Sequence, residues 1–448
     1  MNQKQLAMLS ALALSLTLGL MMFGGHTTYA AGPWYVDSVQ GNDANGCMAP
    51  GISACKTIQA AIDKTTSSGD TIYVAAGTYY EHLVVNTPNI KLLGESRDTT
   101  IIDATQDPAW SVAKAGILIR GTGESRPGAS GVEVKHFTIQ NAQFQTGGVP
   151  FGGDFYGVGA GGLTGIQIYG SSGNTIEDNI VERSGYQVWV LAEWSAAGYG
   201  DANDNVITGN IIRDSAVEGH GVYLYTDDSV SVKNTVITNN EISNITTPNY
   251  SAIRFRGEGG GTISGTIVEN NSIHKATYGI RLSDLLDITG TVIHQNNISG
   301  NGTGLRNQLD ATVDATCNWW GAASGPGPVG PGVGDPVSEN VIYSPWLIGP
   351  PPGSVCTVPT KKECKKATED NGKAFDQQQK ADKKAFDDQQ KADKKAFDAT
   401  HPSPQDRQAF DEQQKAADKA FDDQQKADKK AFDKQNEADK KQCDQLPK

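Results

Sequence analysis

Short aliphatic segments alternate with polar turns through the middle of this chain, and one pattern recurs. Each copy has an aliphatic residue, an asparagine three positions later and then another aliphatic; the copies read TIEDNIV, VITGNII, VITNNEI, IVENNSI and VIHQNNI. Their asparagines follow one another at spacings of 31, 30, 31 and 25 residues, at Asn179, Asn210, Asn240, Asn271 and Asn296. A period this short and regular predicts a solenoid in which each repeat is one coil.

A second strand-like stretch in each unit has apolar residues at every other position. The copies are GIQIYG, QVWVLA, GVYLYT, AIRFRG, GIRLSD and GLRNQL, starting at residues 165, 187, 221, 252, 279 and 304. Turns rich in Asn, Gly, Ser and Thr separate the strands, which favours parallel strands stacked along one axis. The expected inward residues are Ile166, Ile168, Val188, Val190, Val222, Leu224, Ile253, Phe255, Ile280 and Leu282.

The repeated asparagine has a structural interpretation. A column of buried amides at a turn lets each side chain bond to those above and below it, and so satisfies backbone groups that a corner leaves unpaired. We therefore expect a ladder rather than a catalytic row.

The two ends of the chain carry different signals. Residues 1–30 have Lys4, a long apolar run and a small-residue site ending at Ala30, typical of a secretory signal. No later segment is apolar enough to span a bilayer. The sequence thus predicts a secreted protein, extracellular, at the cell surface or in the periplasm, and its six cysteines predict three disulfides. Local spacing suggests the pairs Cys47–Cys55, Cys317–Cys356 and Cys364–Cys443.

The tail repeats the unit AFDxQQKADKK from residue 373 onward. An 11-residue spacing is three helical turns, so the phenylalanines fall on one line. They lie symmetrically about a break at residues 401–404, which predicts a helical hairpin with phenylalanines facing each other and a disulfide at its open end. Two separate solvated helices, or a disordered charged tail, remain alternatives.

Charge divides the chain in the same way. Residues 361–448 hold 21 basic and 20 acidic residues, whereas residues 31–360 hold 16 basic and 31 acidic. An acidic body excludes a basic nucleic-acid-binding protein. The tail, with both signs on its polar faces, fits a spacer or a module that binds a protein or cell-wall partner rather than a membrane helix.

Several segments resemble the bacterial secreted right-handed β-helix proteins of the pectin-lyase-like superfamily: YVDSVQGNDANGC, CKTIQAAID, SGDTIYVAAGTYYEHLVV, NIKLLGE, TIIDA, CNWWGAASGPG and YSPWL. The resemblance covers about residues 34–348. It implies an all-β right-handed parallel β-helix whose first coil is capped by a helix at TIQAAID, with Ile58, Ala61 and Ile62 on its apolar face. It also implies an acidic polysaccharide as partner, but the complete catalytic signatures of the superfamily's enzymes are absent. Gly219, His220 and Gly221 match a polygalacturonase triplet, yet Asp227 and Asp228 follow it here instead of preceding it.

Aligning the second strand across coils predicts two outward columns. The first is Gln167, Trp189, Tyr223, Arg254, Arg281 and Arg306, and the second is Tyr169, Leu191, Tyr225, Arg256, Ser283 and Gln308. An acidic ridge follows, with Glu193, Asp227, Asp228, Glu258, Asp284 and Asp310. Aromatic faces stack on sugars and arginines grip carboxylates. The candidate substrate-binding residues are Trp189, Tyr223, Tyr225, Arg281 and Arg306.

Two kinds of catalysis fit these columns. A lyase would use Arg254 or Arg256 near a calcium ion held by Asp227, Asp228, Glu258 or Glu193. A hydrolase would use paired carboxylates such as Glu193 and Glu258. His220 is a further candidate, although a histidine buried at a bend and bonded to backbone is the competing interpretation. Arg254, Arg281 and Glu258 have a purely structural alternative, a surface ion-pair ladder.

Residues 145–163 interrupt the coil period with a glycine-rich insertion, and Phe151, Phe155 and Tyr156 make it a candidate lid. The expected organisation is a signal at 1–30, the β-helix at 31–348, a Pro/Gly-rich linker at 349–362 and the hairpin at 363–448. The expected function is binding of an extracellular, acidic polysaccharide, with polysaccharide lyase or glycoside hydrolase activity left open. The alternative is a non-catalytic surface or envelope protein with the tail as its attachment module.

Overall fold

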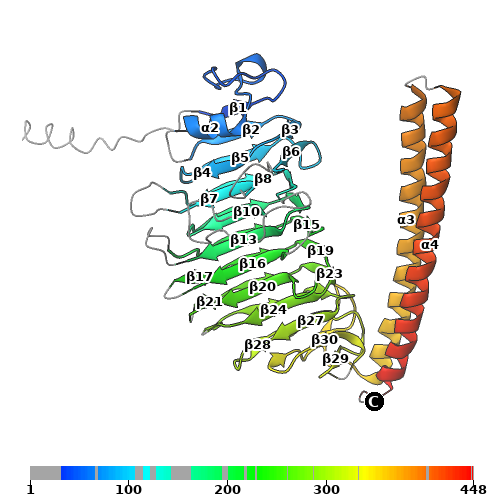
Figure 1. Ribbon diagram of the computed structural model, residues 1–448. Coiled ribbons are helices and arrows are strands. Elements are labelled where there is room, and N and C mark those ends of the chain that lie inside the picture. The colour runs from blue at the N-terminus through cyan, green and yellow to red at the C-terminus, as the bar shows by residue number, and fades with distance from the viewer. Residues whose placement is uncertain are drawn as a thin grey trace, which may run out of the picture.

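The computed structural model describes residues 32–65, 69–105, 115–121, 128–142, 163–193, 200–215, 219–227, 230–259, 261–285, 287–330, 332–399, 403–444 and 446. Within these residues the chain forms a parallel β-helix followed by a hairpin of two long helices (Figure 1). The expected signal peptide, residues 145–162 of the candidate lid and Asp228 lie outside the described residues.

Three parallel sheets form the walls of the β-helix. The first holds β1 (Trp34–Val36), β2 (Thr71–Val74), β5 (Lys91–Gly94), β8 (Glu133–Lys135), β11 (Thr175–Glu177), β14 (Val206–Thr208), β18 (Val236–Thr238), β22 (Ile267–Glu269), β25 (Val292–His294), β28 (Val313–Asp314) and β31 (Val341–Ile342). The second holds β3 (Gly77–Tyr79), β6 (Thr100–Asp103), β9 (Thr138–Gln140), β12 (Ile180–Glu182), β15 (Ile211–Arg213), β19 (Glu241–Ile245), β23 (Ser272–Ala276) and β26 (Asn297–Ile298).

The third sheet bears the expected outward columns. It holds β4 (Leu83–Val85), β7 (Ile117–Arg120), β10 (Thr164–Tyr169), β13 (Tyr186–Ala192), β16 (Val222–Thr226), β20 (Ser251–Gly257), β24 (Tyr278–Ser283), β27 (Thr303–Asn307), β30 (Gly334–Val337) and β29 (Pro326–Pro328). A small side sheet pairs β17 (Ser231–Lys233) with β21 (Thr262–Ser264).

The core runs along the axis between the sheets, where each coil places aliphatic side chains above those of the coil before. All ten residues expected to point inward are fully buried. Ile166, Val188, Val222, Ile253 and Ile280 form one continuous column by strand register. This confirms the period-two interpretation, because a slip of one residue would have turned each of these side chains to the surface.

The asparagine ladder is also confirmed. Each amide Nδ2 donates to the Oδ1 of the next asparagine at 2.9–3.1 Å, from Asn179 through Asn210, Asn240 and Asn271 to Asn296. Asn296 donates to a sixth member, Asn318, at 2.9 Å. Each Oδ1 also accepts a backbone N–H of the preceding asparagine, so the amides close a corner that the sheets leave open.

The first coil is covered by a short helix and a disulfide loop. Helix α2 (Ile58–Lys64) is capped at its N-terminus by Thr57 and buries Ile58, Ala61 and Ile62, as expected. Before it, Cys47 bonds Cys55 around the 3-10 helix η1 (Gly51–Ser53). The helix closes the apolar end of the core, which would otherwise face water.

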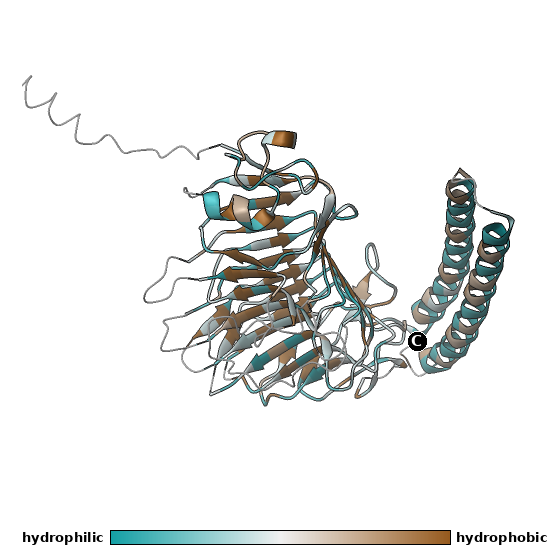
Figure 2. Cartoon of the chain, turned by 45° about the horizontal axis from the view of Figure 1, so that its top comes forward, coloured by the Kyte–Doolittle hydropathy of each residue, from teal (hydrophilic) through white to brown (hydrophobic). Residues whose placement is uncertain are grey.

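The tail folds as the expected hairpin, with α3 (Lys361–Ala399) and α4 (Pro404–Cys443). Ser403 caps α4 in a capping box with Asp406. The rings of the three phenylalanine pairs stack with centroids 4.1–4.3 Å apart, in the pairs Phe375–Phe432, Phe386–Phe421 and Phe397–Phe410. The hairpin is mostly hydrophilic (Figure 2), and none of the described helices is long and apolar enough to cross a membrane.

The base of the hairpin is fixed to the last coils. Cys364 bonds Cys443, and Cys317 bonds Cys356 beside the antiparallel pair β32 (Trp346–Leu347) and β33 (Cys356–Thr357). The buried Asp439 carboxylate of α4 accepts the backbone N–H groups of Ala323 at 2.9 Å and Ser324 at 3.0 Å. The base of the hairpin is therefore fixed to the β-helix, and from there the two helices extend beside the β-helix (Figure 1).

Candidate functional site

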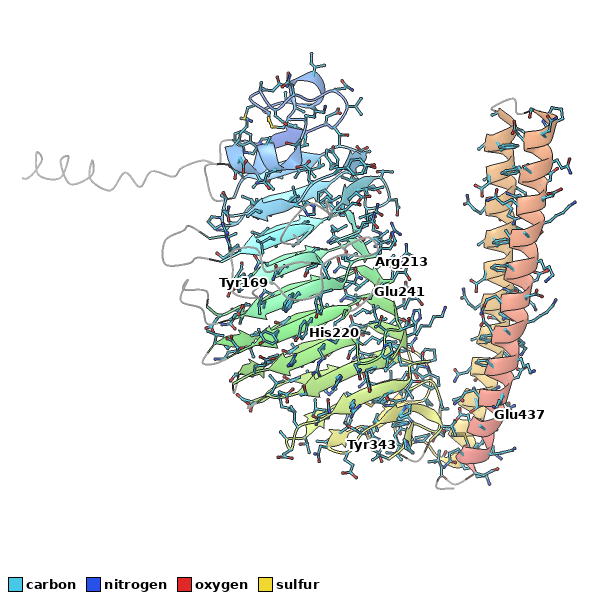
Figure 3. All side chains as sticks on the ribbon, in the orientation of Figure 1. Tyr169, Arg213, His220, Glu241, Tyr343 and Glu437 are labelled. Carbon is cyan, nitrogen blue, oxygen red and sulfur yellow. A yellow bond between two sulfur atoms is a disulfide. The ribbon has the colours of Figure 1, made fainter. Side chains whose placement is uncertain are left out.

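The two outward columns lie in register as expected. The first runs from Gln167 through Trp189, Tyr223, Arg254 and Arg281 to Arg306, each paired with the next on the neighbouring strand. The second runs through Tyr169, Leu191, Tyr225, Arg256 and Ser283. Tyr169 and His220 lie on this sheet, whereas Arg213 and Glu241 lie toward the side that faces the hairpin (Figure 3).

A cavity of about 610 Å³ opens on this face between β13, β16, β20 and β24. Three arginines line it, Arg254, Arg256 and Arg281, with aromatic rings on the adjoining wall. A polar loop, residues 247–249, and Asp284 complete the lining. A hollow walled by aromatic faces and guanidinium groups suits a ring-shaped ligand that carries negative charge.

Arg254 is the most unusual group in the cavity. Its side chain is 5% exposed, and its Nη1 is buried without a hydrogen-bond partner in the described part of the chain. Nη2 donates to the hydroxyl of Ser283 at 2.5 Å, and that hydroxyl donates to Asp284 at 2.6 Å. Burial, reinforced by the charge of Arg281, lowers the pKa of Arg254 to about 10, so it remains a cation at neutral pH.

The expected ladder of Arg254, Arg281 and Glu258 does not form. Among the described residues, neither Arg254 nor Arg281 has a carboxylate within salt-bridge distance; instead Arg256 Nη2 binds Glu258 Oε1 at 2.5 Å. Arg281 is held by Gln308 at 2.7 Å and by the carbonyl of Asn249 at 3.2 Å. Two of the three cations in the cavity therefore lack a direct ion pair among the described residues, and Asp284 reaches Arg254 only through the hydroxyl of Ser283.

His220 faces the cavity as a neutral donor. Its Nδ1 accepts the backbone N–H of Ser251 at 2.9 Å, which leaves the ring proton on Nε2. Burial and then the charge of Arg254 hold its pKa well below the usual range. The ring packs against Tyr223 and Tyr250 at centroid distances of 4.8 and 5.0 Å. His220 thus both bonds to the backbone and lines the cavity, because the chain turns at the start of the strand.

A second cavity of about 270 Å³ continues the first, since Tyr186, Tyr223 and Arg256 line both. Glu193 and Glu258 reach into it, beside Trp189 and Tyr225. Trp189 stacks on Tyr223 at 5.4 Å. The two cavities together form a groove along the sheet, which we call the aromatic–arginine groove.

Other expected site residues lie outside this lining. Arg306 donates to the hydroxyl of Tyr278 at 2.8 Å and does not line either cavity. Asp227 is half-buried, and its charge helps to raise the pKa of Glu193. Apart from the residues that are not described, no three of the acidic residues expected to bind calcium bring their oxygens within 4.8 Å of one another. Calcium therefore stays a prediction.

The sequence interpretation missed two aromatic residues and one loop. Tyr186 and Tyr250 line the large cavity together with residues 247–249. Tyr186 stacks on Tyr223 with centroids 5.5 Å apart. By register it occupies the position equivalent to His220 one coil earlier, so the argument that a turn can rotate His220 outward would have found Tyr186 too.

The coils and their strand register define the class of protein, which is a parallel β-helix. A family model described as "Right handed beta helix region" matches residues 111–319. No curated protein sequence matches the chain.

Similar solved structures include a complex of XylC with xylose (12% identity, 65% of this chain and 66% of that one, TM-score 0.45). Others are the GH136 lacto-N-biosidase of Eubacterium ramulus (10%, 65% and 60%, 0.38) and the DFA-IIIase of Arthrobacter chlorophenolicus A6 with DFA-III (16%, 64% and 83%, 0.40). The chain thus spans less than two thirds of the length of the first two. With identities this low, function has to be argued from the site itself.

Proposed function

We propose that this protein is exported and binds an acidic polysaccharide in the aromatic–arginine groove. The observation that carries the proposal is Arg254, a buried cation with no carboxylate partner among the described residues. Burying a charge without a direct ion pair costs several kcal/mol, and an anionic ligand in the groove would offset that cost. The carboxylates of a uronic acid polymer are anions of the right geometry for guanidinium groups.

The rest of the groove supports a sugar rather than a simple anion. Tyr186 and Trp189 each stack on Tyr223, all three rings line the smaller cavity, and pyranose rings bind aromatic faces. The groove follows the stacking direction of the coils, so it accommodates consecutive residues of a polymer. Three disulfides fit an oxidising compartment outside the cytosol.

The test measures binding and stability in the same variants. Affinity electrophoresis in gels containing polygalacturonate, alginate or a neutral glycan, with and without calcium, should retard the protein in an acidic gel alone. Arg254→Met should weaken binding roughly 10- to 100-fold, the loss of about 1.5–3 kcal/mol expected for hydrogen bonds to a charged group. Arg213→Gln is the matched control, because Arg213 pairs with Glu182 away from the groove.

Stability separates a ligand-binding arginine from a structural one. If Arg254 is kept for a ligand, Arg254→Met should leave the free energy of unfolding unchanged or raise it, since it removes an uncompensated buried charge. A large loss of stability would favour a structural role. Absence of retardation in every gel would favour the other function, a non-catalytic envelope protein whose clamped hairpin serves as an attachment arm.

A further inference from the structure

The smaller cavity holds two carboxylates in contrasting environments. Glu193 follows β13 and is 5% exposed, and the hydroxyl of Tyr169 donates to its Oε2 at 3.0 Å. Burial, with the negative charges of Asp227 and Glu258, raises its pKa and favours the protonated form. Glu258 follows β20, is exposed and is paired with the guanidinium of Arg256.

An independent feature of the same cavity points to a ligand. Trp189 lines it and is 4% exposed, and its indole Nε1 is buried with no hydrogen-bond partner among the described residues. An indole N–H in that state is normally satisfied by a partner. Because the two cavities share Tyr186, Tyr223 and Arg256, a polymer anchored by its carboxylates in the larger one extends over the two glutamates.

We propose that Glu193 and Glu258 are the catalytic residues of a glycoside hydrolase that cuts the acidic polysaccharide within the groove; this rests on the proposed binding function. Glu193, as general acid, gives its proton to the glycosidic oxygen while the bond from that oxygen to the anomeric carbon breaks. Glu258, as general base, takes a proton from the water whose oxygen bonds to the anomeric carbon. One water is consumed, and the products are a new reducing end and a free hydroxyl group.

The spacing of the two residues predicts the stereochemistry. Glu193 and Glu258 follow strands two coils apart, and coils are separated by roughly 4.8 Å, so their backbones lie on the order of 9–10 Å apart. A backbone spacing of this size leaves room for a water molecule between the two carboxyl groups, as inverting enzymes require with carboxyl groups roughly 6.5–9.5 Å apart. The product is therefore expected with inverted anomeric configuration.

The experiment follows binding and cleavage in parallel with the full-length protein. Polygalacturonate and alginate are incubated with wild type, Glu193→Gln, Glu258→Gln and the control Glu241→Gln, whose glutamate contacts His274 on another sheet. New reducing ends and ultraviolet absorbance of unsaturated uronates are measured, and binding is read from affinity electrophoresis. We expect wild type and Glu241→Gln to release reducing ends without unsaturated products. Glu193→Gln and Glu258→Gln should be slower by roughly 100-fold or more while binding normally.

Each contrary result has its own meaning. A polymer that is bound but not cut refutes hydrolysis and leaves the binding function standing, whereas absence of binding removes both. Unsaturated products would show elimination instead of hydrolysis and overturn the acid and base roles of the two glutamates. Activity retained in Glu193→Gln would remove it as the acid. Wild-type activity should also fall on the alkaline side as Glu193 loses its proton.

Discussion

Asn240, in the middle of the asparagine ladder, offers a quantitative test of what holds the coils together. Its Oδ1 accepts the backbone N–H and the side-chain Nδ2 of Asn210, both at 3.0 Å. Its Nδ2 donates to the carbonyl of Ile207 at 2.9 Å and to Asn271 Oδ1 at 3.0 Å. Asn240→Ala removes all four hydrogen bonds from a site that is 2% exposed.

The four bonds are not equally costly to lose. Asn210 Nδ2 keeps two other acceptors, and Asn271 Oδ1 still accepts the backbone N–H of residue 240. The backbone N–H of Asn210 loses its partner, which costs about 1–3 kcal/mol for a buried donor. With about 1 kcal/mol for each of the other three bonds, the expected loss is roughly 4–6 kcal/mol.

Guanidinium unfolding followed by circular dichroism measures this loss. Asn239→Gly is the matched control, because Asn239 is exposed and has a φ of 57°, a conformation that glycine adopts freely. We expect Asn239→Gly to change the free energy of unfolding by no more than about 0.5 kcal/mol. If Asn240→Ala cost less than about 1 kcal/mol, the ladder would be a by-product of the turn rather than a source of stability.

Two further predictions concern the ends of the molecule. The double variant Cys364→Ser/Cys443→Ser removes the hairpin disulfide, which joins residues 79 apart, and should destabilise the hairpin by about 4 kcal/mol. The helical circular dichroism signal should then be lost at a lower guanidinium concentration. An unchanged midpoint would show that the stacked phenylalanine pairs keep the hairpin folded without the disulfide. Burial raises the pKa of Asp335 to about 7, although hydrogen bonds from Asn301 and Gly300 oppose the shift. The protonated carboxyl therefore stabilises the fold fully below about pH 4, the ordinary pKa of an unfolded aspartate, and this contribution is lost as the pH rises to about 7. Relative to Asp335→Asn, the wild type should lose up to about 4 kcal/mol across that range, and a constant difference would contradict the assignment.

The spacing of the sequence repeats was enough to predict most of the fold. In a solenoid each residue's vertical neighbour lies one repeat away, so aligning the repeats was enough to predict that Trp189, Tyr223, Arg254 and Arg281 share a column. The hairpin followed for the same reason, because an 11-residue period keeps Phe386 opposite Phe421.

The tertiary structure decided what the columns do chemically. Whether Arg254 has a carboxylate partner depends on how far side chains extend between coils, and it is Arg256 that forms the salt bridge with Glu258. The turn before each strand directs Tyr186 and His220 into the groove although strict alternation assigns them to the core. The hydrogen bond from the backbone N–H of Ala323 to the carboxylate of Asp439 joins residues 116 apart in sequence, and no sequence repeat indicates this contact. Periodicity fixes which residues are neighbours, whereas pairing, burial and proton affinity depend on distances that only the folded chain sets.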